Sequence, residues 1–423
     1  MTARKIAPYG SWVSALGADR VASATLRLGQ IGIAGDTVYW TEGRPQELGR
    51  NALVRAGADG VAHDVTAAPW NVRTRVHEYG GGAFALGAGE VFFSHDDDQR
   101  LYRQRTSSTP IALTVTAGMR YADAVVDTRR ARLIAVREDH SNTGEPVNAL
   151  VAIDLASGAE RVVAGGHDFC SNPCLSPDGR QLAWLAWDHP NMPWDRTELW
   201  LAELGADGLP SGARKVAGGR SESIFQPLWS PAGALHFVSD RSGWWNLYRE
   251  RGGEVEALCP MAAEFGRPQW VFGMRTYGFD GRGRIVCIYQ AGGASQLAIL
   301  DPAAPGLRKI ETPYTSIRDI EVGAGFAAFF GGSATAPEAL VRLDLESERT
   351  VVLRSSGDAP ASPGWVARAE AIVFAGSGGA EAHAYYYAPR NDSFEAPPGE
   401  LPPLLVIAHG GPTGATDSTF RWS

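Results

Sequence analysis

The stretch Ser176-Pro177-Asp178-Gly179-Arg180-Gln181-Leu182-Ala183-Trp184 decides the fold, because one unit of a repeat can be traced outward from it. Its first four residues are typical of a tight turn, in which proline fixes φ and glycine accepts a positive φ. The residues from Gln181 onward are typical of a strand, and a further strand begins at Glu198-Leu199-Trp200. The stretch therefore predicts a turn and two successive strands of one β-sheet.

The motif around Leu199, a polar or small residue followed by leucine and an apolar strand, recurs along the chain. It is found at Ala52-Leu53-Val54, Arg100-Leu101-Tyr102, Ala149-Leu150-Val151, Glu198-Leu199-Trp200, Asn246-Leu247-Tyr248, Gln296-Leu297-Ala298 and Ala339-Leu340-Val341. The leucines are 48, 49, 49, 48, 50 and 43 residues apart. Steps of about 40 to 50 residues filled with short strands and turns are typical of β-propeller blades. The pattern predicts a mostly β protein with a seven-bladed β-propeller over residues 29–355.

Composition and charge exclude several classes of protein. The 50 glycines and 26 prolines among 423 residues indicate many turns. The net charge of −8 is spread without a basic block, which argues against nucleic acid as a partner. No apolar run approaches about 18 residues, so no membrane span is expected. The first 30 residues do not resemble a secretory signal, and a cytoplasmic location is expected.

The four cysteines predict neither a disulfide framework nor a zinc site, because they are few and lack CxxC spacing. No metal or organic cofactor is expected. Cys170 and Cys174 are interpreted as small core residues.

The pattern changes after the propeller. Residues 371–374 and 382–389 predict a strand pair, and a proline-rich linker covers 390–403. The five apolar residues 404–408 then predict a buried strand, which His409-Gly410-Gly411-Pro412 ends. Adjacent glycines let a main-chain N–H approach a bound group, as an oxyanion hole requires, although an ordinary strand-ending turn is the alternative. Residues 365–423 are therefore predicted to be the first strands of an α/β-hydrolase domain.

Several segments, in this order around seven blades, carry a resemblance to a known family. They are residues 71–82 (NVRTRVHEYGGG), 136–140 (VREDH), 182–194 (LAWLAWDHPNMPW), 238–248 (VSDRSGWWNLY) and 409–414 (HGGPTG). The chain resembles the prolyl oligopeptidase-type serine peptidases, particularly the acylaminoacyl-peptidase and dipeptidyl-aminopeptidase branch. The resemblance implies a propeller capping an α/β-hydrolase whose Ser, Asp and His cleave short peptides, with a narrow tunnel that excludes folded proteins.

The resemblance also implies roles for the glycine turn. The main-chain N–H of Gly411 would donate to the oxyanion, and His409 and Gly410 would position that loop. The triad should follow in the order Ser, Asp, His, yet no G-x-S-x-G occurs in these 423 residues. The chain is therefore expected to be inactive alone, with a further hydrolase region packing on the propeller. Residues 1–28 are expected to pack on the hydrolase side.

The same resemblance implies that propeller residues hold the amino end of a short peptide. An acidic side chain suits a free α-amino group, and arginine suits a peptide carbonyl. The candidates are Arg75, His77, Glu78, Glu138, Asp139 and Trp194. The first three lead into the innermost strand of blade two, the next two are expected in a loop of blade three, and the tryptophan is expected in an extra loop of blade four. For each of them, a purely structural pairing is the alternative.

Two functions remain open from the sequence. The first is a serine exopeptidase or oligopeptidase that acts on short peptides. The alternative is a non-catalytic propeller that binds peptides or proteins. The strand and glycine turn after the propeller favour the first, and the missing nucleophile favours the second.

Overall fold

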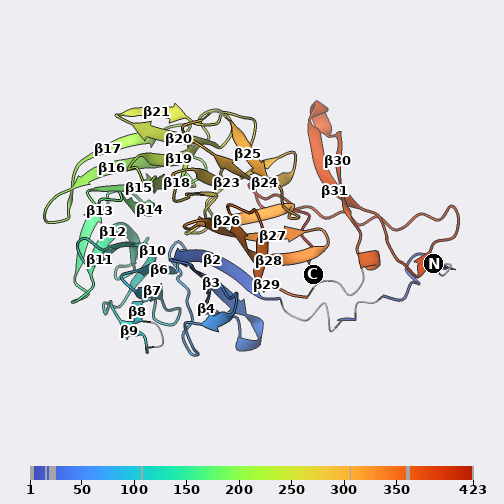
Figure 1. Cartoon of the computed structure of the whole chain (residues 1–423), viewed down its shortest axis with the longest axis horizontal. Coiled ribbons are helices and arrows are strands. Elements are labelled where there is room, and N and C mark those ends of the chain that lie inside the picture. The colour runs from blue at the N-terminus through green and yellow to red at the C-terminus, as the bar shows by residue number, and fades with distance from the viewer. Residues whose placement is uncertain are drawn as a thin grey trace.

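The computed structural model describes residues 4–14, 17–18, 25–105, 108–304, 306–358 and 363–421. Seven four-stranded antiparallel sheets follow one another along the chain, each made of four consecutive strands. Figure 1 shows their first strands around a common centre, with the later strands further out. The predicted seven-bladed propeller is confirmed, and it runs from the start of β2 to the end of β29.

The strands of the blades are bounded as follows. Blade one has β2 (Arg27–Ala34), β3 (Thr37–Arg44), β4 (Arg50–Ala56) and β5 (Ala62–Asp64); blade two has β6 (Phe84–Gly87), β7 (Glu90–Ser94), β8 (Leu101–Arg105) and β9 (Ile111–Ala112); blade three has β10 (Met119–Asp127), β11 (Arg132–Asp139), β12 (Val147–Asp154) and β13 (Glu160–Ala164); blade four has β14 (Phe169–Leu175), β15 (Gln181–Trp187), β16 (Glu198–Leu204) and β17 (Pro210–Gly218). Blade five has β18 (Ile224–Trp229), β19 (Leu235–Ser239), β20 (Asn246–Arg251) and β21 (Glu254–Ala257); blade six has β22 (Tyr277–Phe279), β23 (Ile285–Ala291), β24 (Ala294–Leu300) and β25 (Leu307–Ile310); blade seven has β26 (Ser316–Val322), β27 (Phe326–Ser333), β28 (Ala336–Asp344) and β29 (Thr350–Ser355). A short 3-10 helix, η1 (Pro45–Glu47), connects β3 to β4.

The hydrophobic core lies between blades rather than within them. Each of seven clusters of buried apolar side chains joins two neighbouring blades, and together they run around the ring. The repeated leucines belong to these clusters, and Leu53, Leu150, Leu199, Leu247 and Leu340 are fully buried. Alternation along each strand places one set of side chains on each face, so every sheet is covered on both sides by its neighbours.

Five of the seven innermost strands share a local feature, a β-bulge that carries a polar residue with positive φ. The residues are Gln30, Asp123, Asn172, Gln226 and Asp319. An extra residue on one strand bends it and turns its side chain out of the regular alternation. Gln226 uses this position to accept from the Thr276 N–H at 2.7 Å and to donate to the Tyr277 carbonyl at 2.7 Å, which links blade five to blade six.

The segment after the propeller forms the predicted strand pair, β30 (Ala369–Ala375) and β31 (Glu381–Tyr387). The short helices η2 (Pro363–Trp365) and η3 (Ser377–Gly379) precede and join these strands. Figure 1 shows the hairpin standing beside the propeller, and the Tyr385 hydroxyl donates to the Gly293 carbonyl of blade six at 2.6 Å. Near the N-terminus, β1 (Lys5–Ile6) pairs in parallel with β32 (Phe394–Glu395).

The expected buried strand at 404–408 is not formed. These residues are in no strand, and the side chains of 404–407 are 79–81 % exposed. A strand needs a hydrogen-bonded neighbour, and none of the described residues pairs with this segment. The expectation for residues 1–28 falls partly on 1–3, 15–16 and 19–24, which lie outside the described residues, as do 422–423 of the predicted hydrolase segment. Within the described ranges, no helix is long and apolar enough to cross a membrane.

Candidate functional site

A cavity of about 320 Å³ lies beside the propeller centre, against blades two, three and four. Its apolar walls are aromatic, formed by Phe169, Trp187, Trp194, Trp270 and Phe272. Three carboxylates, those of Glu78, Glu138 and Glu145, reach the same space. A mostly apolar hollow with a few convergent charges is the usual form of a small-ligand site.

The acidic end of the cavity is built on three adjacent strands of blade three. Arg120 on β10, Glu138 on β11 and Asn148 on β12 stand directly opposite one another in the sheet register. The Glu138 carboxylate is only 3 % exposed, accepts from the His77 main-chain N–H at 2.7 Å and lies 3.0 Å from His140 Nε2. The cavity thus contains a buried carboxylate held in one orientation.

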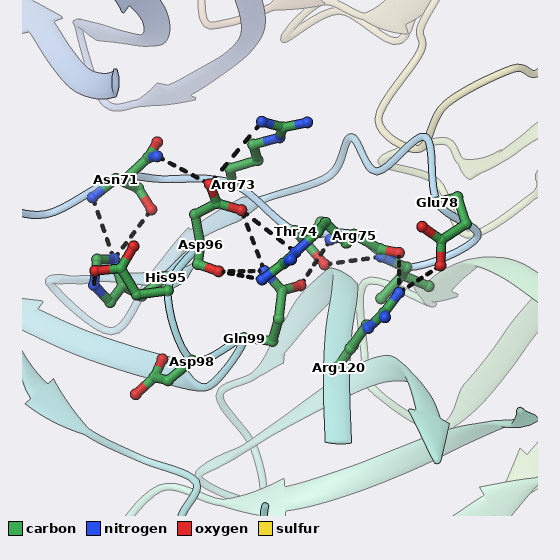
Figure 2. A network of polar contacts seen from close by, with 12 residues as sticks. Asn71, Arg73, Thr74, Arg75, Glu78, His95, Asp96, Asp98, Gln99 and Arg120 are labelled. Carbon is green, nitrogen blue, oxygen red and sulfur yellow. Dashed lines mark hydrogen bonds and ion pairs between the residues drawn. The ribbon is translucent and has the colours of Figure 1, made fainter. Parts of the chain in front are cut away.

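Arg120 connects this buried carboxylate to a second one at the rim. Its guanidinium bonds to Glu78 at 2.7 Å and to the Arg75 carbonyl at 3.0 Å, and it lies 3.9 Å from Glu138. Figure 2 shows Arg120 between Glu78 and the main chain of Arg75. The hydrogen bond from Arg120 lowers the pKa of Glu78. Three carboxylates against one guanidinium leave this end of the cavity negatively charged.

His77 lies between the carboxylate and the aromatic wall. Its ring packs edge-on against Phe169 at 5.0 Å and lies 4.8 Å from the ring of Phe272, and Nε2 is 3.2 Å from Asn148 Oδ1. Burial lowers the pKa of His77, so its ring is neutral near pH 7. His77 and Glu78 both have positive φ, which shows that the chain turns sharply here.

Two of the expected substrate residues lie outside the cavity. The Arg75 side chain donates to the Asp96 carbonyl at 2.7 Å, a contact that fixes the loop between β7 and β8 (Figure 2). Asp139 accepts from the Ser141 N–H and hydroxyl, bonds that lower its pKa. The expected loop location of Glu138 and Asp139 is wrong, because both end strand β11. Adjacent strand residues point to opposite faces, so only Glu138 reaches the cavity.

Trp194 lines the opposite wall and connects the cavity to the glycine turn. It lies in the extra loop of blade four, and its ring meets that of Trp270 at 4.5 Å. The Trp270 indole N–H donates to Thr413 Oγ1 at 2.8 Å. Thr413 is two residues beyond Gly411, whose φ of +76° requires glycine. His409, Gly410 and Gly411 are exposed on this side of the molecule.

Sequence reasoning missed Arg120, His140 and Trp270. Arg120 stands in a strand-like stretch without a motif, His140 ends the 136–140 segment and directly follows β11, and Trp270 lies in an irregular segment between blades five and six. The one available signal was the period-two alternation of the 136–140 segment, which places His140 on the same side as Glu138.

The fold defines a seven-bladed propeller with a cavity beside its centre, and comparisons with known proteins show which family such a chain belongs to. No model of a protein family and no curated protein sequence matches the chain. A solved puromycin-hydrolyzing peptidase of Mycobacterium tuberculosis is 37 % identical with a TM-score of 0.91, over 98 % of this chain and 66 % of that one. A puromycin hydrolase complexed with PGG is 36 % identical with a TM-score of 0.92, over 99 % and 67 % of the two chains.

The chain therefore belongs to the prolyl oligopeptidase family of serine peptidases, and it spans about two thirds of the length of these solved relatives. Prolyl oligopeptidase B of Galerina marginata shares the fold at 15 % identity, with a TM-score of 0.65 over 86 % of this chain and 56 % of that one.

Proposed function

We propose that this chain is the propeller and oxyanion segment of a serine peptidase that hydrolyses short peptides or aminoacyl amides with a free amino end. In this proposal the nucleophile, acid and base lie outside these 423 residues, in a hydrolase region that packs on the propeller. The solved relatives that hydrolyse puromycin support the reaction class. The observation that carries the proposal is the buried, oriented carboxylate of Glu138 at one end of an aromatic cavity.

The chemistry follows from the positions of the charges. An α-ammonium group entering the cavity would lose its water and bind to the carboxylates of Glu138 and Glu78. Arg120 would keep the Glu78 carboxylate oriented. The first side chain would lie against the aromatic wall. The carbonyl to be attacked would then lie toward the turn that Trp270 holds through Thr413, where the Gly411 N–H would stabilise the developing oxyanion.

The proposal is tested with the protein as its own gene encodes it, using peptide nitroanilides with free or acetylated amino ends. Glu138→Gln keeps the size of the side chain and removes its charge, so kcat/KM for free-amino substrates should fall about 10- to 100-fold, the worth of one charge-assisted hydrogen bond. The loss should be carried mainly by KM, because ground state and transition state share this contact.

Asp139→Asn is the matched control, because Asp139 neighbours Glu138 in sequence but lies outside the cavity. Its kcat/KM should stay within about twofold of the unsubstituted protein. Equal hydrolysis of free and acetylated substrates, together with a harmless Glu138→Gln, would contradict the proposal. Binding of free-amino peptides without cleavage would favour the non-catalytic peptide-binding propeller instead.

A further inference from the structure

Residues 266–275, which we call the crossing segment, connect blade five to blade six and contact blades two, four and seven on the way. Gln269 Nε2 donates to Asn172 Oδ1 of blade four at 2.9 Å. Phe272 pairs with Gly81, which leads into blade two. The Arg275 guanidinium lies 2.9 Å from Glu321 of blade seven. Blades two, four and seven are not neighbours, so the crossing segment lies across the centre of the ring.

The main chain of the crossing segment contacts the main chain of the glycine run that leads into blade two. The Phe272 N–H donates to the Gly80 carbonyl at 2.9 Å, and the Asp123 N–H donates to the Gly82 carbonyl at 2.9 Å. The φ angles of Gly80, Gly81 and Gly82 are +70°, +86° and +56°. A Cβ at Gly81 would lie 2.3 Å from the Phe272 carbonyl O, and one at Gly80 would lie 2.2 Å from the Thr74 carbonyl O. This contact therefore requires the run of three glycines.

The paired segments lie between two separate cavities. On one side is the aromatic cavity, lined by Gly80, Val271 and Phe272. On the other is a cavity of about 220 Å³ in the propeller channel, lined by Gly82 and Gly273 together with inner-strand residues. The two cavities have no lining residue in common. The paired main chains thus separate the lining of one cavity from the lining of the other.

We propose that Gly80, Gly81, Gly82 and Phe272 form a specificity-determining partition that makes the aromatic cavity blind on its channel side. This inference rests on the proposed function and distinguishes an exopeptidase from an oligopeptidase. A peptide reaches the cavity from the side, past the exposed rim residues Met192 and Trp270, and only a chain end fits. The enzyme is then an exopeptidase, and the propeller channel is not the route of its substrate.

The partition itself is tested without any ligand, by amide hydrogen exchange of the unsubstituted protein. A fixed partition predicts that the Phe272 and Asp123 amides exchange as slowly as amides in the central strands of the blades. Exchange as fast as in exposed loops would show that the wall opens, and would overturn the proposal.

The route is tested with two cysteine variants and a bulky maleimide. Met192→Cys places the thiol at the rim of the aromatic cavity, and Val125→Cys places it in the channel cavity. Binding is measured with the tripeptide Phe-Gly-Gly carrying a dye at its carboxyl end. Modification at the rim should weaken binding at least tenfold, and modification in the channel should change it less than twofold. The unsubstituted protein treated with the same reagent gives the background from its four cysteines.

Equal loss of binding from both modified variants would overturn the lateral route, whereas failure of the reagent to reach the channel position would itself exclude the channel. The same peptide with two further glycines at its amino end should bind at least tenfold more weakly, and equal binding would overturn the blind cavity. If the unmodified protein binds neither peptide, the proposed function fails, and the partition is judged by the amide exchange alone.

Discussion

At the scale of residues, burial decides which ionisable groups carry charge. His77 is surrounded by aromatic rings and remains neutral, although it lies close to Glu138. The neutral ring then adds no charge to the cavity, where the carboxylates of Glu78 and Glu138 lie close to the guanidinium of Arg120. A neutral His77 can still orient the site, because its main-chain N–H rather than its ring bonds to Glu138.

His236 on β19 gives the clearest pH dependence of folding. Its ring is buried, Nδ1 is 3.0 Å from the Ala234 carbonyl O, and burial lowers its pKa from about 6.5 to about 4. The unfolded chain takes up this proton at higher pH than the folded protein. The stabilisation from the neutral ring is therefore complete above about pH 6.5 and is lost as the pH falls toward 4.

Replacing that ring should flatten the acid side of the stability curve. In His236→Phe, the decrease in the free energy of unfolding between pH 7 and pH 4 should be smaller by roughly 3 kcal/mol, as denaturant titrations at each pH would show. His63→Phe, at an exposed position of β5, is the control and should leave the decrease unchanged. An unaltered curve for His236→Phe would mean that the pKa of this histidine is the same in the folded and unfolded states.

At the scale of elements, the bulges of the inner strands connect the blades around the channel. Each bulge turns a polar side chain toward the next blade or the crossing segment, where it bonds to main-chain or side-chain groups. Gln226, which is 3 % exposed, satisfies both the Thr276 N–H and the Tyr277 carbonyl. Such a side chain contributes more to the free energy of unfolding than a hydrogen bond at the surface does, because its loss leaves buried groups unpaired.

Gln226→Ala should therefore lower the free energy of unfolding by about 2–5 kcal/mol, from two buried main-chain groups left without partners. Chemical denaturation monitored by tryptophan fluorescence would measure the change. Gln46→Ala removes an exposed glutamine from η1 and should change stability by less than about 0.5 kcal/mol. Equal effects of the two substitutions would show that the bulge side chain does not hold the blades together.

At the scale of the whole molecule, the described strands close the ring without an exchange between blades. Among the described residues, blade one consists of β2–β5 and blade seven of β26–β29, so their interface is non-covalent. It includes a shared apolar cluster, the bond from the Arg318 guanidinium to the Leu28 carbonyl at 2.8 Å, and the ion pair between Arg354 and Glu42 at 2.7 Å. Every other interface joins blades that follow one another along the chain.

This difference predicts where the ring opens first. Phe330→Ala at the junction of blades seven and one, and Phe237→Ala between blades four and five, both remove a fully buried ring and should each cost about 3–5 kcal/mol. Only Phe330→Ala should make the amides of β2 and β26 exchange by local opening, ahead of global unfolding. Hydrogen exchange at increasing denaturant separates the two, and identical exchange patterns would contradict the weak junction.

Sequence alone determined the number of blades, their strand order and the hairpin after them. Turn residues, leucine spacing and alternation act over a few residues, and every blade satisfies the same local rules. The same local reasoning failed at 404–408, where apolar composition predicted a buried strand although no described strand pairs with it. Apolar composition indicates that a segment favours burial, but it does not show which neighbouring strand the segment pairs with.

Only the tertiary structure decided which of the candidate residues form the site. Glu78, Arg120 and Glu138 are brought together by the stacking of two blades, and the strand register separates Glu138 from its neighbour Asp139. Trp270 meets Thr413, and three glycines meet Phe272, across segments that are far apart in the chain. The physical reason is that such contacts depend on how the ring closes. The short-range conformational preferences of the residues do not determine them.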